Sequence, residues 1–73
     1  MEVERLVTLA NDIAAFYAAW DDPAAAATEM TSHLRRFWEP RMRRALVAHV
    51  QGGGEGLVPL ARAAALALTD EVK

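Results

Sequence analysis

Three prolines divide this chain of 73 residues into four short segments. Pro23, Pro40 and Pro59 each precede a stretch rich in helix-forming residues. Proline is well tolerated at the first position of a helix, because its missing N–H would have no partner there. Inside a helix it removes a hydrogen bond and clashes with the preceding turn. The spacing of the prolines therefore predicts an all-α fold in which three helices begin at a proline.

Apolar residues recur every three or four positions in each segment, as they do along one face of an amphipathic helix. In the first segment this stripe runs from Val3 to Trp20, and we expect its aromatic residues to pack in the core, although they could instead form an exposed partner-binding face. Asp22 can cap the second helix, and Gly52 can end the third. We predict a small helical bundle in a single domain, 1–73, with three main helices at about 3–19, 23–37 and 40–51 and a short fourth helix at about 58–68.

The size of the chain points to a stabilising partner. A domain this small buries only about 60% of its unfolded surface, so such domains usually need a disulfide, a metal or another chain. The sequence has no cysteine, which excludes disulfides and thiolate metal sites. The acidic start, Met1–Arg5, does not resemble a signal peptide, and no apolar run approaches the length of a membrane span. We expect a cytoplasmic protein with no membrane partner.

The middle of the chain concentrates positive charge. Residues 33–50 contain five arginines and one glutamate, a net charge of +4 with neutral histidines, whereas the whole chain carries −2. Pro40 ends one helix and opens the next, which places Trp38 at the corner between them. We expect Trp38 and the arginines to point outward, and Leu34 and Phe37 to face the core.

This basic stretch has three interpretations. The simplest is a solvated helical surface. The second is a small helix–turn–helix-like DNA-binding regulator, because two helices meet at a short turn; the acidic net charge and the lack of a turn glycine argue against it. The third is a protein–protein surface, since arginine and tryptophan dominate many interfaces. Such a surface could serve a different protein or make this a self-associating helical protein.

No catalytic arrangement stands out in the sequence. Ser32 and His33 are neighbours on one predicted helix, so their side chains point in different directions. His33 and His49 belong to different helices. Glu29 lies four residues before His33, but two such ligands are common by chance, and His49 is better explained as a packed, hydrogen-bonded residue. The glycine-rich stretch 52–56 lacks the spacing and the lysine of phosphate-binding loops. We expect no catalytic residue, no cofactor and no metal.

The run His33–Arg43, with the sequence HLRRFWEPRMR, resembles the small delta subunit of soluble NAD-dependent, molybdenum-containing formate dehydrogenases. The resemblance extends to the opening Arg5–Val7, to the glycine turn 52–54 and to Pro59. In such enzymes the large subunits carry the molybdopterin cofactor, iron–sulfur clusters, flavin and NAD site. The resemblance therefore implies an accessory subunit without catalytic residues of its own.

The resemblance also implies what this chain would bind. The expected partners are the large subunits of the formate dehydrogenase complex, not nucleic acid, and the isolated chain could form a homo-oligomer. The function implied is that of an accessory subunit or an assembly and stability factor. The shared motif supplies the candidate partner-binding residues: His33, Arg35, Arg36, Phe37, Trp38, Pro40, Arg41 and Arg43.

Overall fold

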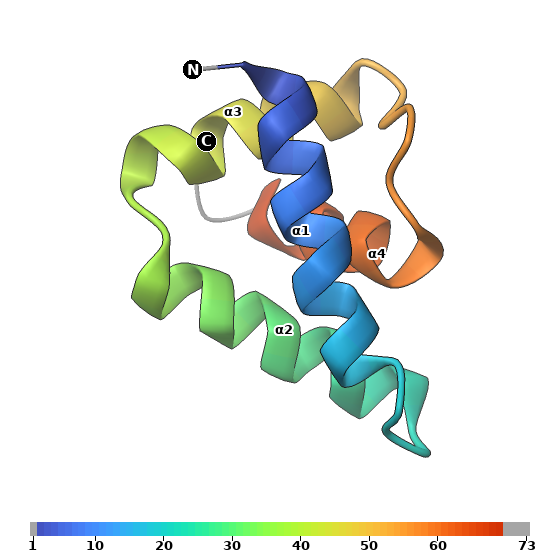
Figure 1. Ribbon diagram of the computed structural model, residues 1–73. Helices are drawn as coiled ribbons and strands as arrows, with labels where there is room; N and C mark the ends of the chain where they lie inside the picture. Colours follow the sequence, from blue (N-terminus) through green and yellow to red (C-terminus); the bar gives the residue numbers. More distant parts are fainter. Residues whose placement is uncertain (1, 70–73) are drawn as a thin grey trace.

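The computed structural model describes residues 2–69, which form helices and connecting turns without any strand. The helices are α1 (Val3–Tyr17), α2 (Pro23–Phe37), α3 (Pro40–Gln51) and α4 (Pro59–Thr69). In Figure 1, α1 lies in front, α2 and α3 run below and above it, and α4 lies behind α1 between them. The predicted all-α helical bundle is confirmed.

Local sequence explains where the helices begin. α2, α3 and α4 each start at a proline. Asp22 caps α2, because its Oδ1 accepts hydrogen bonds from the backbone N–H groups of Ala24 (2.9 Å) and Ala25 (3.4 Å). The apolar pattern predicts a first helix to about residue 19, but α1 ends at Tyr17 and the chain then turns toward Asp22. α4 has 11 residues against 12 in α3, so it is nearly as long as a main helix.

The core is built from aliphatic side chains and alanine. Each helix contributes at least one of the largest fully buried side chains, which are Leu6, Met30, Leu34, Leu46 and Leu68. α4 adds Ala61, Ala64 and Ala65, all fully buried. Such small side chains let helices approach closely, and α4 accordingly packs against α2, α3 and α1. Close packing of this kind leaves little room inside for large aromatic rings.

The loop between α3 and α4 is tied to the helices by polar side chains. Asn11 of α1 donates from Nδ2 to the carbonyl of Gly56 (2.9 Å), and its Oδ1 accepts from the N–H of Val58 (3.0 Å). His49 donates from Nε2 to the carbonyl of Glu55 (2.8 Å), which agrees with its expected role as a hydrogen-bonded residue. Arg62 donates to the carbonyl of Gly54 at 3.2 Å.

Gly54 shows why this loop needs glycine. Its φ of +67° lies in the left-handed region that side chains disfavour. A Cβ atom at Gly54 would also stand 3.0 Å from the Arg62 guanidinium, which crosses directly over it. The glycine therefore serves both the turn and the close approach of Arg62.

We predict that Asn11→Ala lowers the free energy of unfolding by about 1–2 kcal/mol, because two hydrogen bonds between α1 and the loop are lost. Urea denaturation followed by circular dichroism measures the change. Asp12→Ala is the matched control, since Asp12 is exposed on the same helix, and it should change stability by less than about 0.5 kcal/mol. Equal stability of the two variants would show that the loop is not held by Asn11.

Candidate protein-binding surface

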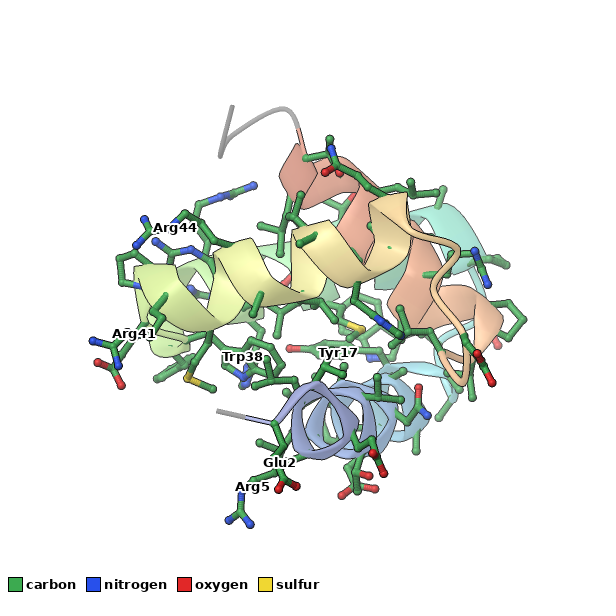
Figure 2. All side chains as sticks on the ribbon, turned by 90° about the horizontal axis from the view of Figure 1, so that it is seen from above. Glu2, Arg5, Tyr17, Trp38, Arg41 and Arg44 are labelled. Atoms are coloured by element: carbon green, nitrogen blue, oxygen red, sulfur yellow. The ribbon has the colours of Figure 1, made fainter. Side chains whose placement is uncertain are left out.

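Trp38 is part of the core and does not point outward. Its side chain is only 7% exposed, and Figure 2 shows it in the space between α1 and α3. Trp38 follows Leu34 by four residues, so it continues the i, i+4 row of buried Met30 and Leu34. Its backbone is extended at the end of α2, while its N–H still donates to the Leu34 carbonyl at 2.9 Å. The expectation of an exposed Trp38 is wrong because this row extends one residue beyond the helix.

Phe37 shows the opposite error. The sequence pattern predicts it in the core, but its side chain is 70% exposed. It belongs to the neighbouring i, i+4 row with Glu29 and His33, which turns away from the buried row. Leu34, by contrast, is fully buried as predicted. The corner thus places a large aromatic side chain in solvent directly beside a buried one.

The half-buried Arg43 links the start of α3 to the end of α2 by hydrogen bonds. Its Nη1 donates to the carbonyl of Trp38 at 2.6 Å and to the carbonyl of Arg35 at 2.8 Å. The last carbonyls of a helix lack partners within the helix, and a cation at this end also interacts favourably with the helix dipole. Arg43 therefore serves the local structure of the corner, although the sequence pattern placed it among the partner-binding residues.

The other predicted residues line the outer side of the corner. Arg35, Arg36, Pro40 and Arg41 are exposed, and His33 is half-buried. Arg44 was absent from the predicted set but is exposed as well, and in Figure 2 it lies with Arg41 at the same end of α3. Its position three residues after Arg41 was the signal that could have identified it. We define the basic corner as Arg36, Phe37, Arg41 and Arg44.

A series of aromatic rings extends from the basic corner onto α1. We call it the aromatic ladder, and it consists of Phe37, His33, Tyr17, Phe16 and Trp20. The ring centroids of His33 and Phe37 are 4.7 Å apart, those of Tyr17 and His33 6.3 Å, those of Phe16 and Tyr17 5.0 Å, and those of Tyr17 and Trp20 5.5 Å. These distances and the mostly edge-on orientations are typical of favourable aromatic pairs.

Much of the ladder is open to solvent. Phe16 is 69% exposed and Trp20 42%, so the expectation that Trp20 packs in the core is wrong. The helix ends at Tyr17, and the turn that follows carries Trp20 out of the buried stripe. Phe16 was missed as a candidate, and its place at the edge of that stripe was the available signal.

A shallow apolar groove borders the ladder. It lies between the C-terminal end of α1 and the start of α4, and its volume is about 300 Å³. Tyr17 and Trp20 belong to both features, so the groove and the ladder form one continuous apolar surface. The groove is lined by Tyr17, Ala18, Trp20, Pro23, Ala26, Pro59, Leu60 and Ala63.

Within residues 2–69, no three His, Cys, Asp or Glu side chains are grouped so that they could hold a metal ion. His33 contacts aromatic rings, and His49 bonds to a backbone carbonyl. None of the helices in this part of the chain has the length and hydropathy needed to cross a bilayer.

The fold and this surface define a small helical protein whose most distinctive exposed side chains are aromatic rings beside arginines. The family of the NADH-dependent formate dehydrogenase delta subunit, FdsD, matches residues 5–65, and the chain belongs to this family. The match contains the whole basic corner and the whole aromatic ladder, and it confirms the resemblance found in the sequence. No curated protein and no solved structure is significantly similar to the chain.

We predict that Trp38→Ala destabilises the fold by about 3 kcal/mol, because it removes a large side chain from a packed core. Phe37→Ala should change stability by less than about 0.5 kcal/mol, because its ring is already in solvent. Urea denaturation compares the two. A larger effect of Phe37→Ala would mean that Phe37, and not Trp38, lies in the core.

Arg43→Ala should lower stability by about 1.5 kcal/mol, since two hydrogen bonds from a charged donor disappear. Arg41→Ala removes a charge from the same helix, but from an exposed side chain, and is the matched control. Thermal unfolding of both variants measures the difference. Indistinguishable midpoints would mean that Arg43 does not hold the corner.

Proposed function

We propose that this chain is a non-catalytic accessory subunit of an NAD-dependent formate dehydrogenase complex, which binds the large subunits and supports their assembly or stability. Membership of the delta subunit family supports the link to this enzyme. The proposed place of action is the cytoplasm, which suits a chain without cysteine.

The observation that carries a binding function is the exposure of Phe37 within the basic corner. Covering a phenylalanine side chain contributes about 1.5–3 kcal/mol, so 70% exposure leaves most of that energy available to a partner. Arg36, which precedes it, and Arg41, at the start of α3, are both exposed and can each bind a carboxylate through two parallel hydrogen bonds. An exposed aromatic side chain together with exposed arginines is the composition of residues that dominate protein interfaces.

The aromatic ladder favours a protein partner over DNA. A helix–turn–helix surface would need the corner to meet phosphate groups, yet Phe37 lies among the arginines there. The exposed rings then continue away from the arginines toward Phe16 and Trp20. A phosphate backbone offers no apolar surface to cover them, whereas a protein does.

We predict that Arg36→Glu and Arg41→Glu each reduce retention of this chain in the purified formate dehydrogenase complex by about tenfold or more, because each reverses a charge at the interface. Affinity purification of the tagged enzyme, with quantification of this chain by mass spectrometry, measures the loss. Arg5→Glu is the control, because Arg5 is also exposed but lies outside the corner, on the outer side of α1 in Figure 2.

The proposed function has its own decisive test. If the wild-type chain never co-purifies with the enzyme, and its deletion leaves formate-dependent reduction of NAD unchanged, the chain is not an accessory subunit of this complex. A gel-shift titration across salt concentrations tests the DNA alternative, because phosphate contacts give binding that weakens steeply with salt.

A further inference from the structure

The aromatic ladder has charge of opposite sign at its two ends. At one end, Phe37 belongs to the basic corner, where the arginines at 36, 41 and 44 and one carboxylate, Glu39, are exposed, so the net charge is positive. At the other end, Trp20 is followed directly by the exposed carboxylate of Asp21. Asp12 precedes Phe16 by four residues and is exposed on the same side of α1. A segment that covers the ladder therefore meets positive charge at one end and negative charge at the other.

The ladder is large enough to be the centre of an interface but too small to be all of it. Rings of this kind bury about 150–250 Å² each, so covering the exposed parts of Phe16, Trp20 and Phe37 would bury roughly 400 Å². A stable interface buries roughly 800 Å² on each partner. The basic corner and the apolar groove border the ladder and would supply much of the remaining area.

The form of the surface indicates how a partner segment would bind. The ladder is made of side chains from α1, α2 and the turn between them, and residues 2–69 contain no sheet edge to which a strand could be added. The path from Phe16 through Tyr17 and His33 to Phe37 has centroid steps of 5.0, 6.3 and 4.7 Å. A helix of about ten residues spans such a length, at about 1.5 Å per residue. Helices bind to such surfaces through apolar side chains on one face.

Building on the proposed function, we propose that the ladder binds an amphipathic helix of a formate dehydrogenase subunit, with aliphatic side chains facing the rings and carboxylates at the end that meets the basic corner. The carboxylates bind the guanidinium groups of Arg36 and Arg41. The opposite end of this helix carries no acidic residue, because it lies beside Asp12 and Asp21.

A second copy of this chain is the alternative occupant of the surface. Pairing two ladders in opposite directions would bring the basic corner of one copy to the acidic end of the other. That end offers Asp12 and Asp21, because the Asp22 carboxylate is already bound to the start of α2, whereas the corner holds three exposed arginines and the exposed Glu39. The charges of such a pair would nearly balance, so the identity of the crosslinked chain, and not charge alone, separates this occupant from an enzyme helix.

Three variants that each replace an exposed apolar side chain by aspartate test the proposal. We expect Phe16→Asp and Phe37→Asp to reduce retention in the purified enzyme complex by about tenfold or more. Leu66→Asp is the matched control, because Leu66 is 52% exposed on α4 and lies outside the ladder and the groove. Its retention should change less than about twofold. Retention of Phe16→Asp and Phe37→Asp at the wild-type level would overturn the proposal and leave the proposed function standing.

Photo-crosslinking identifies the occupant without disturbing the fold. p-Benzoylphenylalanine placed at position 16 or 37 keeps an aromatic ring in the ladder, so this measurement also decides the matter if an aspartate variant unfolds. We expect both positions to crosslink to one helix of an enzyme subunit, with position 37 nearer to its acidic residues. Crosslinks to a second copy of this chain would overturn the proposal, as would crosslinks to a segment without carboxylates. Failure of the wild-type chain to co-purify would remove the proposed function itself.

Discussion

The insertion of Trp38 between α1 and α3 is the interaction on which this structure depends. Pro40 prevents α2 from running on, and the two residues before it take extended conformations. That local change carries the indole into the core, where no other aromatic ring is buried among residues 2–69. Arg43 then binds the carbonyls left open at the end of α2. The Trp38 side chain and the hydrogen bonds of Arg43 thus fix how α2 and α3 are placed relative to each other.

The composition of the core explains why the outside of the protein is aromatic. α4 contributes mostly alanine to the interior, and the helices that pack on it come too close to enclose further rings. Phe16, Trp20 and Phe37 are consequently exposed, and Tyr17, whose ring lies next to those of Phe16 and Trp20, is half-buried. The tight core and the apolar surface are therefore two results of the same distribution of side-chain sizes.

The sequence predicts the helices well because their starting signals are local. A proline at the first position acts within a few residues, as does the Asp22 cap, so both are visible without knowledge of the fold. The sequence pattern predicts an exposed Trp38 and a buried Phe37, whereas Trp38 is buried and Phe37 is exposed. A helical stripe can continue by a step of three or of four residues, and the extended backbone after α2 decides between them. The ladder could not be predicted from the sequence, because Tyr17 and His33 lie close together only through the packing of α1 against α2.

The hydrogen bonds of Asn11 join residues that are 45 and 47 positions apart in the chain. α1 can make these bonds only after α3, the glycine loop and the start of α4 have taken their places, because contacts of such long range carry a high cost in chain entropy. These bonds of α1 thus require that the rest of the fold is in place. The ladder is shared by α1, α2 and the turn between them, so it exists only where α1 packs against α2. A partner that recognises the ladder thereby distinguishes copies in which α1 and α2 are packed together from unfolded copies.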